Sequence, residues 1–284
     1  MAKSDRPEHS LPQEVSRYYA RGQEGDRLAG AEGELEFVRT QEILGRYLPD
    51  PPATILDVGG GPGAYATWLA KKGYEVHLLD PVPLHVEQAR QASQNQPETP
   101  IASINLGEAR KLSQADGSID VVLLLGPLYH LMDAVDRKVA IGEAYRVLKP
   151  GGLMAAAGIS RFASALAGLI DDHLEDAEFR RIVQRDLTDG QHRNPTEKPS
   201  YFTTAFFHHP QELKAEVEED GFAVEAVVAI EGVGVFLGDL EARMQDPPRR
   251  KLLLDALRWL EADSSVIGIT GHLLAIGVKP ASPQ

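Results

Sequence analysis

The chain has no cysteine, few aromatic residues and no long apolar run. Without cysteine there is no disulfide, and no thiolate can serve as a nucleophile or metal ligand. No segment approaches the ~18 apolar residues that a membrane-spanning helix needs. The opening residues, MAKSDRPEHSLPQEVSRYY, lack the apolar core of a signal peptide. We therefore expect a cytoplasmic protein with no membrane partner.

Basic residues are also scarce relative to acidic ones. Lysine and arginine number 29 against 42 aspartates and glutamates, which gives a formal net charge of −13. A nucleic acid is a polyanion and needs a basic surface, so the charge argues against a nucleic-acid partner. The 284 residues suffice for one large globular domain with a substantial core.

The most informative stretch is 55–70, which reads ILDVGGGPGAYATWLA. An apolar run ends at Asp57, glycines stand at 59, 60, 61 and 63, and a helical pattern follows. This pattern predicts a strand, a tight turn and a helix start. Glycine has no Cβ, so a ligand can approach the backbone of the turn closely and meet free N–H groups at the helix start. A glycine turn alone is a weak signal, because dinucleotide-binding proteins share it.

Three further motifs follow in order and narrow the interpretation. They are YEVHLLD, which ends in Asp80, then LGEARKL at 106–112, and YRVLKPGG at 145–152. Together with the glycine turn they resemble the class I S-adenosylmethionine-dependent methyltransferases. The resemblance covers roughly residues 50–160 strongly and the flanks weakly, and it names no substrate.

The alternation of elements predicts an α/β fold. Strands are expected at 54–58, 75–79, 101–105, 120–125 and 153–159, with helices between them, as in right-handed βαβ units of a parallel sheet. Later strands at 223–231 and 271–278 complete a Rossmann-like, mostly parallel, seven-stranded sheet with helices on both faces. In the family that the chain resembles, an antiparallel final strand commonly closes this sheet.

The flanks are expected to cover the site. We expect a disordered tail at 1–13 and a single domain over 14–284, with N-terminal lid helices at 14–48. An insertion at about 160–210 begins with one helix over 162–185 and ends in an aromatic run. It is expected to lie over the ligand end of the sheet.

The resemblance implies residues for the cofactor, S-adenosylmethionine. The glycine turn would meet its methionine and sugar, and Asp80 the ribose, with a helix cap before Pro81 as the alternative for Asp80. Glu108 with Ala109 would meet the adenine, although aspartate is more frequent than glutamate at that family position and a solvated loop charge is the alternative for Glu108. Asp57 would support the turn or the ammonium group, and a purely structural role is an alternative. From the N-terminal segment, aromatic Tyr18 and Tyr19 can close over a sulfonium, and either Arg27 or Arg39 can clamp the carboxylate. The expected cofactor-binding residues are Asp57, Gly59, Gly61, Gly63, Asp80, Glu108, Ala109, Leu125, Tyr19 and Arg27.

The acceptor side follows the fourth expected strand. The expected catalytic residues are His130 and Tyr129. Tyr129 would line the pocket, and His130 would act as a general base because its ordinary pKa lies near neutral pH. The alternative for His130 is to cap or pack the next helix. The run at 201–209 supplies an aromatic and histidine cluster for the acceptor, with core packing as its alternative, and its spacing shows no metal site. The expected substrate-binding residues are Tyr129, Tyr201, Phe206, His208 and His209.

The expected function is methyl transfer from S-adenosylmethionine to an oxygen, nitrogen or carbon nucleophile of a small molecule, by a monomer or a homodimer. Two alternatives keep the same cofactor site. One is other chemistry on the cofactor, either aminocarboxypropyl transfer or cyclisation with release of methylthioadenosine. The other is a regulatory protein that binds the cofactor without turnover.

Overall fold

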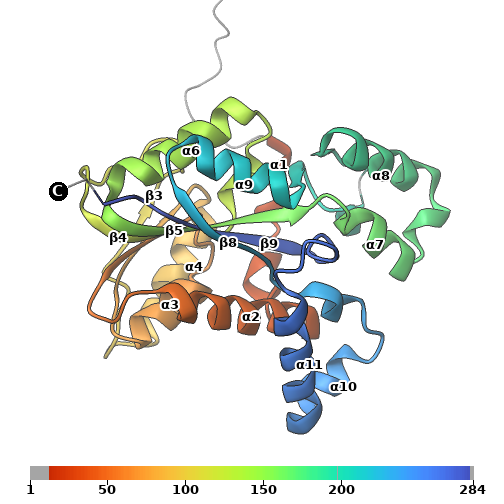
Figure 1. Ribbon diagram of the computed structural model, residues 1–284, viewed down its shortest axis with the longest axis horizontal. Helices are drawn as coiled ribbons and strands as arrows, with labels where there is room; N and C mark the ends of the chain where they lie inside the picture. Colours follow the sequence, from red (N-terminus) through yellow and green to blue (C-terminus); the bar gives the residue numbers. More distant parts are fainter. Residues whose placement is uncertain (1–12, 197, 282–284) are drawn as a thin grey trace, which may run out of the picture.

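A mostly parallel β-sheet runs through the centre of the molecule (Figure 1). The computed structural model describes residues 13–196 and 198–281. In that part the sheet has nine strands, with β3-β2-β1-β4-β5-β7-β6 as one path, while β9 pairs with β5 and β8 pairs with β9. The strands are β1 (Thr54–Val58), β2 (Glu75–Asp80), β3 (Ser103–Leu106), β4 (Ile119–Leu124), β5 (Leu148–Ser160), β6 (Gln191–His192), β7 (Ala205–His208), β8 (Ala223–Ala229) and β9 (His272–Val278).

Strand direction places the loops that follow β1 to β5 on one edge of the sheet. Strands β1 to β5 are parallel, so their carboxyl ends meet on the same side of the sheet. Strand β9 runs antiparallel to both β5 and β8. The order reverses between β1 and β4, and in open α/β sheets a ligand binds beside such a reversal.

Helices cover both faces of the sheet. Figure 1 shows α2, α3 and α4 on one face and α6 and α9 on the other, while α7 and α8 project beyond the end of β5. The α-helices are α1 (Gln13–Tyr19), α2 (Ala31–Tyr47), α3 (Ala64–Lys71), α4 (Pro83–Gln94), α5 (Pro127–His130), α6 (Ala134–Val147), α7 (Ala163–Ile170), α8 (Ala177–Asp189), α9 (Pro210–Glu219), α10 (Leu240–Gln245) and α11 (Pro247–Leu260). Short 3-10 helices lie at Gln23–Asp26 (η1), His173–Glu175 (η2), Pro199–Tyr201 (η3) and Gly232–Phe236 (η4).

Each face has its own apolar core. Ile141 of α6 and Leu213 of α9 pack in one core, and Ile43 of α2 and Leu69 of α3 pack in the other. Strands β1 and β4 contribute side chains to both cores, so both of their faces are buried, as is usual in parallel sheets.

The expected fold class is confirmed, but the insertion differs in detail. The single helix expected over 162–185 is wrong, because Asp172 adopts a left-handed conformation with φ of 55° and ends the first helix. Asp176 then accepts a hydrogen bond from the Glu178 N–H and starts α8. The expected count of seven strands is also low, since β5 extends to Ser160 and its end pairs with β7 of the insertion.

The tail expected at 1–13 lies outside the described residues apart from Gln13, where α1 begins. Among the helices that the structure describes, none is long and apolar enough to cross a membrane.

Candidate active site

A cavity of about 1260 Å³ opens at the carboxyl ends of β1 to β4. The loops after these strands form its floor, and residues from η1, α1 and the insertion form its walls. Its lining includes Tyr19, Glu24, Arg27, Asp57, Gly59, Gly61, Tyr65, Asp80, His85, Glu108, Ala109, Arg110, Leu125, Tyr129, His130, Arg137, Gln191, Arg193, Thr204 and Phe206. The structure therefore brings together nine of the ten expected cofactor residues.

The glycine turn after β1 forms one wall of the cavity. Gly59 has a φ of 69°, and a Cβ there would lie 2.8 Å from Pro127. Gly61 has a φ of 56°, and its added Cβ would meet only Glu24, at 3.9 Å. Gly63, the exception among the expected residues, is the N-cap of α3 and packs against Ala89 instead of lining the cavity.

Asp57 lies under this turn and is almost fully buried. Neither carboxylate oxygen has a hydrogen-bond partner within 13–196 and 198–281. Burial, together with the nearby Asp80, raises the pKa of Asp57 to about 7. A buried carboxylate without a partner is costly, so this side chain is well suited to a donor or cation supplied by a ligand.

Asp80 ends β2 and is held by three hydrogen bonds. Its Oδ2 accepts from the Gly61 N–H at 2.9 Å, and its Oδ1 accepts from the Val82 N–H at 2.8 Å. Nδ1 of His85 lies 3.1 Å from the same Oδ1. These contacts fix the carboxylate against the glycine turn. The motifs did not identify His85. The available signal was its position in the first turn of the helix that follows the strand-end Asp80.

The loop after β3 carries Glu108 and Ala109, both of which line the cavity. Oε2 of Glu108 accepts a hydrogen bond from Arg110 at 2.9 Å, and Arg110 also pairs with Asp136 of α6. This loop is therefore ordered by its own ion pairs.

His130 joins the acceptor end of the cavity to both flanks. Its Nε2 lies 2.6 Å from the hydroxyl of Tyr19, and its Nδ1 lies 3.3 Å from the carbonyl oxygen of Thr204. Nδ1 must donate to that carbonyl, so Nε2 accepts from Tyr19. Burial lowers the pKa of His130 to about 4 and keeps the ring neutral at neutral pH. Burial also raises the pKa of Tyr129, so that hydroxyl stays protonated.

The two candidate arginines lie in different places. Arg27 lines the cavity and pairs with Glu24 at 2.6 Å and with Glu36. Arg39 is fully buried away from it.

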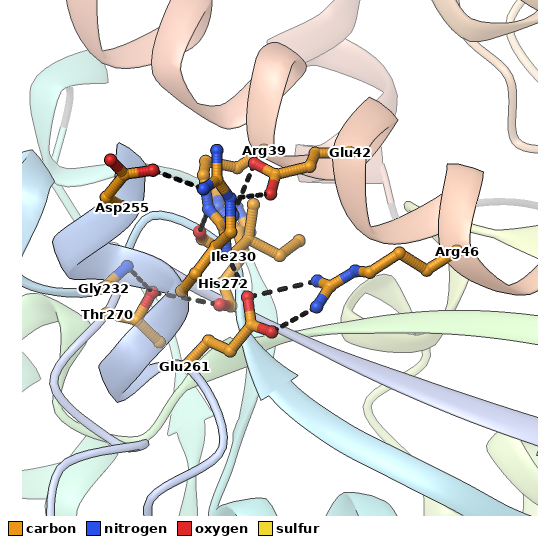
Figure 2. Close-up of polar contacts among 10 residues, drawn as sticks. Arg39, Glu42, Arg46, Ile230, Gly232, Asp255, Glu261, Thr270 and His272 are labelled. Carbon is orange, nitrogen blue, oxygen red and sulfur yellow. Dashed lines mark hydrogen bonds and ion pairs between the residues drawn. The ribbon is translucent and has the colours of Figure 1, made fainter. Parts of the chain in front are cut away.

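Arg39 belongs to a charge cluster between α2 and the C-terminal part of the chain (Figure 2). It donates to Glu42 at 2.7 Å, to Glu261, and to the carbonyl oxygen of Ile230 at 3.1 Å. Arg46 holds the other side of Glu261. Arg39 therefore has a structural role and not the ligand-binding role that was one of its expected options.

Of the expected aromatic and histidine cluster, Phe206 lines the cavity and three members lie elsewhere. Tyr201 is buried against Phe179 and donates to Asp176. His208 lies on the same face of β7 as Phe206 and packs against its ring, with Nε2 3.3 Å from Glu216, but it does not line the cavity. His209 is the N-cap of α9. The physical reason is packing: the 3-10 turn at Tyr201 places that ring against Phe179, and His208 is fully buried between Phe206 and Glu216.

Glu36, Glu231 and His272 form a second cluster, whose ligand atoms lie within 4.8 Å of one another. Nδ1 of His272 is 2.6 Å from Glu231. Burial alone would lower the pKa of His272, but the two carboxylates outweigh it and raise that pKa to about 9. A protonated His272, with Arg27 on Glu36, balances these charges without a metal ion.

Residues 56–156 match the model of a methyltransferase domain family. Those residues form a methyltransferase domain of the class I S-adenosylmethionine-dependent superfamily. The expected resemblance is confirmed, and the cofactor of this superfamily is S-adenosylmethionine.

Individual relatives match only part of the chain. An uncharacterised methyltransferase of Mycobacterium tuberculosis is 34% identical over 111 residues, which are 39% of this chain and 42% of that protein. A ubiquinone biosynthesis O-methyltransferase of Methylocella silvestris is 34% identical over 129 residues, covering 43% of this chain and 48% of that protein. The chain therefore spans less than half the length of these relatives.

Among solved structures, a SAM-dependent methyltransferase from Methanosarcina mazei superposes with a TM-score of 0.57 at 20% identity, over 84% of this chain and 98% of that one. This likeness supports the fold.

The cavity fits the cofactor of the superfamily. Gly61 leaves its wall open where a side chain would project, and Asp57 offers a buried carboxylate without a partner. Asp80 lies beside the turn, where it can reach hydroxyl groups.

Proposed function

We propose that the protein is a methyltransferase that transfers a methyl group from S-adenosylmethionine to a nucleophile of a small molecule. The observation that carries this is that two carboxylates, Asp57 and Asp80, flank an open glycine turn within a methyltransferase domain. The same cavity continues past Tyr129 and His130 toward the insertion, which leaves room for an acceptor.

The cofactor half of the cavity would bind through fixed groups. Asp57 would balance the ammonium group, Asp80 would accept from the ribose, and Glu108 with Ala109 would contact the adenine. Arg27 lines the same cavity and would meet the carboxylate. When bound, S-adenosylmethionine supplies an electrophilic methyl group on its sulfonium sulfur.

The acceptor half would act mainly by positioning. Tyr129 and Phe206 supply apolar walls, and His130 supplies a neutral acceptor of a hydrogen bond at Nε2. If Tyr19 gives up that contact, His130 can orient a hydroxyl or amine of the acceptor and take its proton as the methyl is transferred. Holding the nucleophile in line and excluding water can provide much of the rate. A base whose pKa lies near 4 contributes less.

The charge balance supports a small acceptor rather than a nucleic acid. The net charge is −13. Of the arginines that line the cavity, Arg110 is paired with Glu108 and Asp136, and Arg137 with Glu216, whereas Arg193 of the insertion contacts only the amide oxygen of Gln191 among the described residues. One such arginine falls far short of the basic surface that a polyanion needs.

The test is to incubate the protein with S-adenosylmethionine and panels of phenols, amines and carboxylic acids, and to identify the sulfur product by mass spectrometry. S-Adenosylhomocysteine together with a methylated acceptor supports the proposal. Methylthioadenosine would instead indicate aminocarboxypropyl transfer or cyclisation. Calorimetry that detects NAD(H) binding but no S-adenosylmethionine binding would overturn the cofactor assignment.

A further inference from the structure

His85 is a buried histidine in the wall of the cavity, and the function proposed above gives it no role. It lies in the first turn of α4 and is 3% exposed. Its Nδ1 lies 3.1 Å from Oδ1 of Asp80. Its Nε2 is shielded from solvent and has no hydrogen-bond partner among the residues that the structure describes.

The contact with Asp80 decides which ring nitrogen carries the proton. A carboxylate oxygen only accepts, so Nδ1 of His85 must donate to it. In the neutral ring, Nε2 then carries a lone pair and accepts. Such a buried acceptor costs free energy until a donor reaches it.

Asp80 has too few free hydrogen-bond acceptor sites to bind both ribose hydroxyl groups fully. A carboxylate has about four acceptor sites. Three are used by the N–H groups of Gly61 and Val82 and by His85. One site remains, whereas the ribose of the cofactor has two neighbouring hydroxyl groups, each of which is a donor. Asp80 can serve one of them fully, and the other needs a different acceptor.

We propose that His85 is a second ribose-binding residue, with Nε2 accepting a hydrogen bond from the ribose hydroxyl that Asp80 does not take. The inference rests on the proposed use of S-adenosylmethionine. The ring of Tyr19 packs edge-on against His85, with centroids 5.2 Å apart. The N-terminal helix α1 therefore covers the same place, and Nε2 becomes available to the ribose when α1 shifts.

The experiment is calorimetric titration of the full-length protein with S-adenosylhomocysteine and with its 2′-deoxy and 3′-deoxy analogues. His85→Phe keeps a ring and removes both nitrogens, whereas His85→Gln keeps an acceptor near the position of Nε2. One hydrogen bond corresponds to about a tenfold loss of affinity for S-adenosylhomocysteine in His85→Phe. We expect His85→Gln to stay within about threefold of the wild type. One of the two deoxy analogues lacks the hydroxyl that Nε2 would contact. Wild type and His85→Phe should bind that analogue with equal affinity.

A matched control is His77→Phe, because His77 lies on the preceding strand β2 and does not line the cavity. It should bind S-adenosylhomocysteine as the wild type does. Unchanged affinity in folded His85→Phe, or an equal loss with all three ligands, would overturn the role of His85 and leave the proposed function standing. If His85→Phe does not fold, His85→Gln is titrated with the same three ligands. This variant should keep its affinity for S-adenosylhomocysteine, and its affinity for the deoxy analogue that lacks the hydroxyl contacted by residue 85 must be lower. Absence of S-adenosylhomocysteine binding by the wild type would overturn the proposed function, and this inference with it.

Discussion

The hydroxyl of Tyr19 donates a hydrogen bond to Nε2 of His130 across 2.6 Å, although the two residues are 111 positions apart in the chain. The opposite nitrogen of the same ring faces the carbonyl oxygen of Thr204. One imidazole thus ties together the N-terminal helix α1, the loop after β4 and the insertion. The two flanks expected to act as a lid meet at this ring.

Tyr19→Phe should loosen α1 without unfolding the protein. The substitution removes one hydrogen bond, worth roughly 0.5–1.5 kcal/mol, and keeps the ring packing. Hydrogen exchange should become faster over residues 13–19 and stay unchanged in the central sheet. Tyr18→Phe, on the neighbouring ring, is the matched control. Unaltered exchange in α1 would show that packing alone holds the helix.

His130 should titrate far below an ordinary histidine. Burial lowers its pKa to about 4, so the ring stays neutral as the pH falls through 6.5. A group whose folded pKa is lowered contributes stability above its unfolded pKa of about 6.5, and that contribution is lost as the pH falls toward 4. NMR titration of the ring proton should show this midpoint, and His130→Gln identifies the signal. A midpoint near 6.5 would mean that the ring is solvated.

Gly61→Val should weaken the binding of S-adenosylhomocysteine by about 100-fold or more, because a branched side chain would enter the cavity. The φ of 56° adds backbone strain for any L side chain. Gly117→Val separates the two effects, since Gly117 has a φ of 62° but lies outside the cavity. That control should lose stability and leave affinity unchanged, as measured by thermal denaturation and calorimetry. Equal affinity in Gly61→Val would place the ligand elsewhere.

Asp57→Asn should change how stability depends on pH. Burial raises the pKa of Asp57 to about 7, whereas an unfolded aspartate titrates near 4. The wild type therefore gains stability as the pH falls from 7 toward 4, because only the folded state takes up this proton. The variant lacks that gain, so denaturant unfolding at pH 8 and pH 5 should show a smaller pH effect. Affinity for S-adenosylhomocysteine should also fall in the variant. Identical pH dependence would mean that Asp57 is solvated.

Arg39→Met should lower the free energy of unfolding by about 3 kcal/mol, since it breaks a buried ion pair and leaves the Ile230 carbonyl without its donor. Arg258→Met is the control, because Arg258 pairs with Glu42 of the same cluster but is exposed, and surface pairs contribute about 1 kcal/mol or less. Denaturant titration compares the two. A cost as small as that of the control would show that the cluster contributes little.

Much of the fold and of the cofactor side could be predicted from local sequence. The glycine turn, Asp57 and Asp80 stand at strand ends, and parallel strands bring such ends to one edge whatever the rest of the chain does. The same local reasoning reached Leu125, and the family resemblance added Glu108 and Ala109; all three line the cavity.

The acceptor side was decided by the tertiary structure. Contacts such as Tyr19 with His130, or Arg39 with Glu261, join residues more than 100 positions apart, and no local periodicity specifies them. The composition of the run at 201–209 indicated a pocket, yet only Phe206 of its expected residues lies in the cavity wall. The turn at Tyr201 and the burial of His208 against Glu216 direct the other side chains into packing. Sequence spacing fixes which residues can share an edge, whereas the packing of distant segments determines which side chains face the cavity.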